Sequence, residues 1–153
     1  MDNLDLKVPP VAFALIVAAF MWLASAAVPA LAFTLPGRLG IATALGAAGI
    51  GFAGAGVVAF RRAKTTVNPT KPGTASTVVT AGVYSFSRNP MYLGLLLALS
   101  GWAVFLNHAL AFVFLPVFVL YMNRFQIGPE EKALLGVFGE EYAAYLKSVR
   151  RWL

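Results

Sequence analysis

The sequence predicts an all-α, polytopic integral membrane protein, with four transmembrane helices followed by a C-terminal amphipathic cytoplasmic helix. Of its 153 residues, 59% are hydrophobic and only 12% are charged, whereas soluble domains carry about a quarter charged residues. The apolar residues also fall into long uncharged runs, and such runs reach the roughly 20 residues that cross a ~30 Å hydrocarbon core. A single membrane domain over residues 1–153 is therefore expected.

The first two spans are expected near residues 9–34 and 39–60. The first run can also be read as a secretory signal peptide, because Ala24-Ser25-Ala26 resembles a cleavage site. However, the head of the chain carries Asp2 and Asp5 against a single Lys7, and the run is longer than a signal requires. We therefore favour a mature transmembrane helix over a cleaved signal.

Small residues recur along the second span at every fourth position, namely Ala47, Gly51, Ala55 and Ala59. This spacing places a smooth stripe on one helix face, where another helix backbone can approach closely. Packing within the chain is the favoured interpretation, and a homodimer interface is the alternative.

Residues 61–88 differ in kind from the spans, since they combine many threonines and serines with Pro69, Pro72 and Gly73. This composition is typical of a loop, and connections of such length are usually functional or disordered. The apolar and aromatic residues of 78–84 argue against disorder. We expect an ordered cytoplasmic loop.

The next apolar region breaks at Asn107-His108, which predicts a hairpin of two spans near 90–106 and 109–125. A further helix is expected over 129–149. Gly128-Pro129-Glu130-Glu131 resembles a helix start, with proline in the first turn and acids near the positive end of the dipole. Apolar residues then recur at helical spacing, so this helix is expected to lie on the membrane surface or the loop, with Gly139 as an interruption.

Eleven of the 12 basic residues fall on one side of the predicted membrane. They are Lys7, five residues between the second and third spans, and five after the fourth. The positive-inside rule makes that side cytoplasmic, so both termini are expected in the cytoplasm. Juxtamembrane lysine and arginine also meet anionic lipids, which explains the net charge of +6 without nucleic acid. The chain has no cysteine, which excludes disulfides and thiolate metal sites, and no metal is expected.

Two polar clusters border the hairpin. The first is the segment from Arg88 to Gly94 at the mouth of the third span, and the second is Glu130-Glu131 after the fourth. Polar groups at a membrane edge are costly unless they are used. Because the cytoplasmic ends of a hairpin are neighbours, we expect the clusters to face each other across a pocket that the C-terminal helix covers.

These clusters carry a resemblance to a known family. Arg88-Asn89-Pro90-Met91-Tyr92-Leu93-Gly94, preceded by Thr80-Ala81-Gly82-Val83-Tyr84 and followed by Glu130-Glu131 and Phe138-Gly139-Glu140-Glu141-Tyr142, resembles the isoprenylcysteine carboxyl methyltransferase family. Phospholipid N-methyltransferases are related to the same superfamily. The resemblance covers about the C-terminal 90 residues. Asn89 departs from it, because the family commonly has histidine there, and asparagine cannot titrate.

The resemblance implies an enzyme that uses S-adenosylmethionine from the cytosol and takes a lipophilic substrate from the bilayer. A carboxylate would bind ribose hydroxyls or the cofactor's ammonium, a tyrosine would lie against the sulfonium, and Arg88 would hold a carboxylate substrate. Arg124 is a second candidate for that task or for pairing with the glutamates. The expected catalytic residues are Arg88 and Arg124, and the expected cofactor-binding residues are Gly82, Val83, Tyr84, Asn89, Pro90, Tyr92, Gly94, Glu130 and Glu131.

The acceptor stays open at this point. Methylation of an isoprenylcysteine carboxylate follows from the resemblance, and a small thiol or a phospholipid amine are the alternatives. An amine needs a proton acceptor, for which the expected pocket offers only Glu130 and Glu131. A non-catalytic membrane protein that retains the pocket is the alternative from another functional class.

Overall fold

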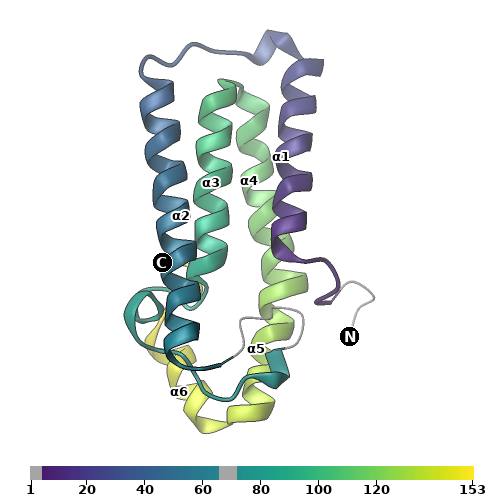
Figure 1. Ribbon diagram of the computed structural model, residues 1–153. Coiled ribbons are helices and arrows are strands. Elements are labelled where there is room, and N and C mark those ends of the chain that lie inside the picture. The colour runs from purple at the N-terminus through teal and green to yellow at the C-terminus, as the bar shows by residue number, and fades with distance from the viewer. Residues whose placement is uncertain (1–4, 66–71) are drawn as a thin grey trace.

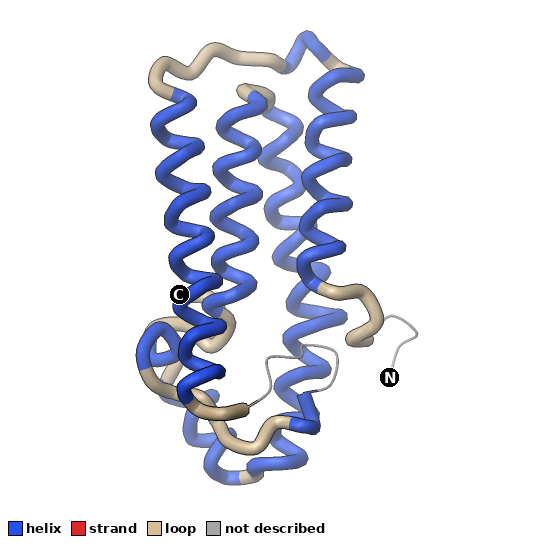
Figure 2. Tube along the Cα trace, in the orientation of Figure 1, coloured by secondary structure: helices blue, strands red, loops and turns tan. Residues whose placement is uncertain are grey.

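The computed structural model describes residues 5–65 and 72–153. Within these ranges it contains helices and one isolated bridge between Ala32 and His108, and no strand (Figure 2). The prediction of an all-α polytopic membrane protein is confirmed. Asp2 and the part of the expected loop at residues 66–71, which includes Pro69, lie outside the described residues.

Four helices stand side by side and two more lie at one end of them (Figure 1). The bundle helices are α1 (Pro10–Ala27), α2 (Arg38–Arg62), α3 (Pro90–Leu106) and α4 (Ala109–Tyr121). Among the described residues, α1, α2 and the unbroken helical stretch Ala109–Phe138 are long and apolar enough to cross a membrane, and α3 is a shorter apolar helix. Both termini lie toward the end of the bundle that carries the extra helices (Figure 1).

The first helix is shorter than its apolar run. It ends at Ala27, and a 3-10 turn over Pro29–Leu31 follows, although the run predicted a span to residue 34. Proline has no N–H to continue the helical ladder, so Pro29 ends the helix where hydropathy alone shows no boundary. Gly37, with φ of 74°, then starts α2 from the left-handed region that glycine adopts most readily.

The expected C-terminal helix is not a separate element after the fourth span, and this prediction was wrong. A π-helical turn, Met122–Ile127, joins α4 directly to α5 (Gly128–Phe138), so the helix continues beyond residue 125. Gly139, with φ of 52° and ψ of −123°, then ends α5, and α6 (Glu140–Ser148) begins after it. The interruption expected at Gly139 is therefore a full change of direction.

The packing of α2 on α3 depends on glycine, but not on the predicted stripe. Gly49 and Gly56 are buried against α3, whereas Ala47 and Gly51 are exposed. A Cβ on Gly94 of α3 would lie 2.5 Å from the Gly49 carbonyl oxygen. The contact face recurs about every 3.5 residues, which is the spacing of a helix seam, so the count of four selected a neighbouring face.

The remaining helices pack through aromatic and hydrogen-bonded contacts. Phe13 of α1 stacks on Tyr121 with ring centroids 3.7 Å apart, and the Trp102 Nε1 donates to the Ala18 carbonyl at 3.1 Å. At the far end of the bundle, the buried His108 ring lies 2.7 Å from the Val28 carbonyl. His108 therefore fastens the connection between α1 and α2, which agrees with the prediction that it lies away from the candidate site.

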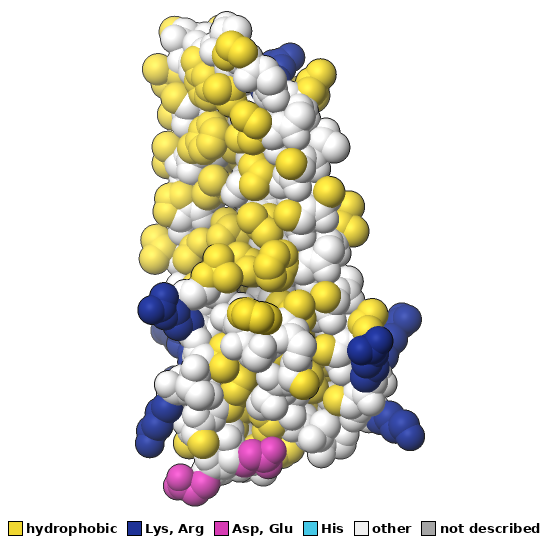
Figure 3. Space-filling view, turned by 90° about the vertical axis from the view of Figure 1, so that its left-hand side faces the viewer, with side chains coloured by type: hydrophobic (Ala, Val, Ile, Leu, Met, Phe, Trp, Pro, Cys, Tyr) yellow, Lys and Arg dark blue, Asp and Glu magenta, His cyan; other side chains and the backbone are white. Residues whose placement is uncertain are grey.

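The surface divides into an apolar belt and a polar end. Yellow hydrophobic side chains cover the upper part of the view in Figure 3, and most of the lysines and arginines in view lie below them. Many large apolar residues of α1, α2 and α4 are exposed, among them Leu15, Ile50 and Leu120 at 66%, 76% and 67%. Such a belt above basic residues is typical of a bundle embedded in lipid.

Candidate active site

A cleft lies at the polar end of the bundle, where α2, α3, α5, α6 and the loop before α3 meet. Its enclosed part has a volume of about 100 Å³, and the whole cleft holds about 790 Å³ when its open mouth is included. It is lined by Phe60, Pro72, Ala75, Thr77, Val78, Val79, Tyr84, Arg88, Asn89, Met91, Tyr92, Glu130, Glu131, Leu134, Tyr142 and Tyr145.

A short 3-10 helix, Gly82–Ser85, carries Tyr84 into one wall of the cleft. Gly82 has φ of 66°, which lets the chain turn into this helix. The Tyr84 ring meets Phe60 edge-on at 5.3 Å, and its carbonyl accepts a hydrogen bond from the Tyr145 hydroxyl at 2.7 Å. Burial raises the pKa of Tyr84, and it raises the pKa of Tyr145 to about 12. Both hydroxyls are therefore protonated at neutral pH and act as donors.

Glu130 is held from two sides. Its Oε1 accepts hydrogen bonds from the Tyr92 hydroxyl and from the Gln126 side-chain amide, both at 2.5 Å. The π-helical turn places Gln126 four residues before Glu130 on the same side of the helix. Among the described residues, no donor reaches the other oxygen, Oε2. Glu130 is thus a fixed carboxylate with one oxygen available to a ligand.

Glu131 lies between two arginines. Its Oε1 accepts from the Arg88 Nη2 at 2.9 Å and from the Arg151 Nε at 3.2 Å, and its Oε2 accepts from the Arg151 Nη2. The Arg88 and Glu131 side chains are only 11% and 13% exposed. Ion pairs of this kind, with little water access and several hydrogen bonds, are much harder to separate than surface pairs. Glu131 is accordingly engaged within the protein.

Arg88 also binds the end of α6. Its Nη1 donates to the carbonyls of Leu146 and Val149, both at 2.7 Å, and its backbone N–H donates to the Arg150 carbonyl at 3.0 Å. The buried Nε has no hydrogen-bond partner among the described residues. A bidentate grip on a substrate carboxylate would therefore require Arg88 to release one of these partners, and Nε is the donor that remains for a ligand.

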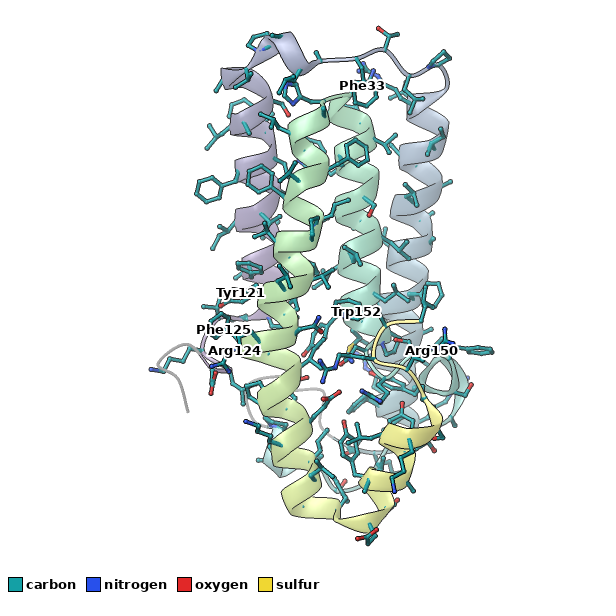
Figure 4. All side chains as sticks on the ribbon, turned by 180° about the vertical axis from the view of Figure 1, so that it is seen from behind. Phe33, Tyr121, Arg124, Phe125, Arg150 and Trp152 are labelled. Atoms are coloured by element: carbon teal, nitrogen blue, oxygen red, sulfur yellow. The ribbon has the colours of Figure 1, made fainter. Side chains whose placement is uncertain are left out.

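The last residues of the chain form a strap that runs back along the cleft toward the bundle, which we define as residues 149–153. The Asn89 side-chain amide donates to the Arg151 carbonyl at 2.9 Å, and the Trp152 Nε1 donates to the Asn123 Oδ1 at 3.1 Å. Figure 4 shows Arg150 and Trp152 on the same side of the long α4–α5 helix. Asn89 therefore acts here as a hydrogen-bond donor to backbone, a task that needs no titratable group.

The structure brings together six of the residues that the sequence singled out, and they come from three separate segments: Tyr84, Arg88, Asn89, Tyr92, Glu130 and Glu131. Gly82, Val83, Pro90 and Gly94 do not line the cleft. Pro90 is fully buried as the first residue of α3, and Gly94 faces α2. These residues shape the backbone around the cleft.

Arg124 lies elsewhere. It borders a second hollow, its guanidinium lies over the Phe125 ring at 5.6 Å, and Figure 4 shows both residues across the helix from Trp152. The π-helical turn changes the register between residue 124 and the glutamates, so Arg124 does not share their face.

Sequence reasoning missed several residues of the cleft. Gln126 was overlooked because the expected helix break before residue 129 hid its spacing of four from Glu130. Arg151 carries no local signal, since only the fold returns it to Glu131. Tyr142 and Tyr145 were interpreted as structural, and they do line the cleft while packing against each other.

Chemically, the cleft offers one available carboxylate oxygen, one buried guanidinium N–H and several aromatic faces beside an apolar bundle. This set suits a ligand that carries both a cation and polar hydroxyls, next to a hydrophobic partner.

Comparison with known proteins adds two matches. The model of the family described as "Phospholipid methyltransferase" matches residues 38–141. An "Uncharacterized protein" of Haemophilus influenzae is 48% identical over 63 residues, which is 41% of this chain and the whole of that protein. No solved structure matches the chain.

Proposed function

The chain belongs to the phospholipid methyltransferase family and is a membrane methyltransferase, and from this premise we propose that it uses S-adenosylmethionine in the cleft to methylate a lipophilic acceptor. The observation that carries the proposal is the position of Glu130, a fixed carboxylate with one available oxygen in a cleft at the end of an apolar bundle. The basic residues around this end make it cytoplasmic by the positive-inside rule.

The residues of the cleft fit such a cofactor. The Glu130 Oε2 is a suitable acceptor for ribose hydroxyls or an ammonium group, and the aromatic rings of Tyr84 and Tyr92 provide faces for a cation. Ligand pockets of about 300–1,000 Å³ are typical, so the cofactor would occupy the open mouth of the 790 Å³ cleft as well as its enclosed part. S-adenosylmethionine supplies a methyl group on a positively charged sulfur, and the sulfur–carbon bond breaks with its electron pair left on sulfur.

A phospholipid amine is the acceptor that the geometry favours. An ammonium must lose a proton before its nitrogen can act as a nucleophile. Glu131 is committed to Arg88 and Arg151, so Glu130 Oε2 is the carboxylate oxygen in the cleft that can take that proton. Tyr92 and Gln126 keep the carboxylate oriented while it does so. Such positioning is the main protein contribution to a transfer between two bound reactants.

An isoprenylcysteine carboxylate is the second candidate. The buried Arg88 Nε is a donor without a partner among the described residues, and a carboxylate oxygen would satisfy it. A carboxylate needs no general base, so Glu130 would then serve the cofactor alone. The two candidates differ in the bond that is formed, which is an amine methyl in one case and a methyl ester in the other.

The test is transfer of tritiated methyl groups by the purified protein in lipid nanodiscs. Phosphatidylethanolamine, a farnesylated N-acetylcysteine and a lipophilic thiol are offered in parallel, and treatment with base separates esters from the other products because esters release volatile methanol. The Glu130→Gln variant is compared with Glu140→Gln, a change of the same chemistry at an exposed position of α6.

We expect base-stable label in phosphatidylethanolamine, at least a hundredfold less of it with Glu130→Gln, since general acid–base groups contribute about 10²–10⁴, and normal label with Glu140→Gln. Base-labile label would transfer the assignment to the carboxylate acceptor. Equal activity of the two variants would contradict the role of Glu130. Absence of label in every acceptor, with protein shown to be folded, would contradict the proposed reaction.

A further inference from the structure

A second hollow lies on the same long helix, away from the cleft. It has a volume of about 520 Å³ and is lined by Asp5, Leu6, Asn123, Arg124, Gly128, Pro129, Lys132 and Ala133. It shares no lining residue with the cleft. Figure 4 shows Arg124 on the side of the helix opposite Trp152, whose strap borders the cleft.

The wall of this hollow follows from the sequence of the helix. In a regular α-helix the carbonyl of Phe125 would accept from the N–H of residue 129, but residue 129 is proline and has none. The backbone N–H of Leu6 occupies that carbonyl instead, at 3.0 Å. The N-terminal segment is thereby fixed to the helix beside Arg124, so the hollow is a built feature between two backbone segments.

The charges of the hollow favour a single negative charge. Its lining holds two cations, Arg124 and Lys132, against one anion, Asp5. Both basic side chains are exposed, and they stand eight residues apart along the helix. A phosphodiester, with one negative charge, matches the single net positive charge of the lining.

The apolar surface next to the hollow is suited to an acyl chain. Val113, Val117 and Leu120 precede Arg124 by eleven, seven and four residues, which is the spacing of one helix face. They are 57%, 48% and 67% exposed. An exposed apolar stripe that ends at a basic residue, on the face of a membrane helix, has the order of a phospholipid from tail to headgroup.

We propose that this hollow is a binding site for a membrane phospholipid, with the phosphate held by Arg124 and Lys132 and an acyl chain along Val113, Val117 and Leu120. The site is separate from the methylation cleft and does not depend on the acceptor that the enzyme uses. Its occupant would also hold the N-terminal segment against the helix, because that segment forms the opposite wall.

The experiment is native mass spectrometry of the full chain released from detergent that contains phosphatidylglycerol. The double variant R124Q/K132Q is compared with R61Q/R62Q, which removes the same charge from exposed positions at the end of α2 that line neither hollow. We expect one retained lipid for wild type and the α2 control, and about tenfold weaker retention for R124Q/K132Q, because basic residues near a membrane contribute about 1 kcal/mol each.

A charge-preserving variant, R124K/K132R, should retain the lipid, and circular dichroism shows that each variant is folded. Equal retention by wild type and R124Q/K132Q would overturn the site, as would equal loss in the α2 control. Displacement of the lipid by millimolar inorganic phosphate would also overturn it, since it would assign the hollow to free phosphate. A variant of the stripe, Leu120→Ser, should weaken retention without any change of charge, and unchanged retention there would contradict the acyl-chain contact.

Discussion

Replacement of Gly94 by alanine separates two roles for a residue that the sequence assigns to the cofactor site. In the structure Gly94 faces α2, and an added Cβ would lie 2.5 Å from the Gly49 carbonyl oxygen and 2.9 Å from the Ala53 nitrogen. Both are backbone atoms, so no side-chain rotation relieves the contact. The two helices would have to separate along their shared face.

Overpacking of this kind costs about 1–3 kcal/mol, which corresponds to a fall in Tm on the order of 5 °C for a chain of this size. The matched control is Gly51→Ala in α2, where an added Cβ meets nothing within 4 Å. Alanine is the better helix former by about 1 kcal/mol, so this variant should be as stable as the wild type or more so.

The assay is thermal unfolding of the detergent-solubilised variants, followed by tryptophan fluorescence, together with ligand affinity measured on the folded fraction. We expect Gly94→Ala to unfold at lower temperature and to bind cofactor normally while folded. An unchanged Tm with lost cofactor binding would refute the packing argument and return Gly94 to the cofactor site.

Three further predictions concern the polar end of the bundle. Asn89→His should retain the bond to the Arg151 carbonyl through an imidazole N–H, whereas Asn89→Leu should lose about 1 kcal/mol of stability; equal Tm values for both would contradict this role, and limited proteolysis of the C-terminal strap provides a second reading. Tyr145→Phe removes the bond to the Tyr84 carbonyl, so the wild-type protein should lose stability between pH 10 and about pH 12, where only the unfolded chain binds fewer protons, and the variant should show a smaller loss; parallel denaturant titrations over this pH range measure it. Arg151→Gln should lower cofactor affinity indirectly, by leaving Glu131 with Arg88 alone, and unlike a change in a contact residue it should be accompanied by faster proteolysis after α5; unchanged proteolysis would refute this.

Composition and local sequence predict much of the fold for clear physical reasons. Pro90 starts α3 because its missing N–H is harmless in a first turn, and Asn107 ends α3 in the left-handed region that asparagine tolerates. The asymmetry of lysine and arginine places the polar end. These are properties of single residues or short runs, and they are visible without knowledge of the tertiary structure.

The misplaced elements depend on hydrogen bonding between segments. Gly128-Pro129 has the composition of a helix start, yet the π-helical turn before it carries the ladder through, and Leu6 satisfies the released Phe125 carbonyl. The seam between α2 and α3 was misjudged because small residues occupy more than one face of α2, and only the partner selects Gly49 and Gly56.

The candidate site divides in the same way. Tyr92, Glu130 and Glu131 were predicted from motifs, and they do meet in the cleft. The partners that define their states, Gln126 and Arg151, belong to segments whose positions depend on the π-helical turn and on the returning C-terminal strap. Sequence therefore indicated which carboxylates are present, while the structure distinguishes the available Glu130 from the engaged Glu131.

The central claim is that the cleft beside Glu130 binds S-adenosylmethionine, and calorimetric titration of the purified protein with S-adenosylhomocysteine tests it most directly. The account predicts saturable binding that is weakened at least tenfold, roughly 1.4 kcal/mol, by Glu130→Gln and left unchanged by Glu140→Gln. Absence of binding at millimolar ligand in folded protein would contradict the claim, and so would equal affinity in the two variants.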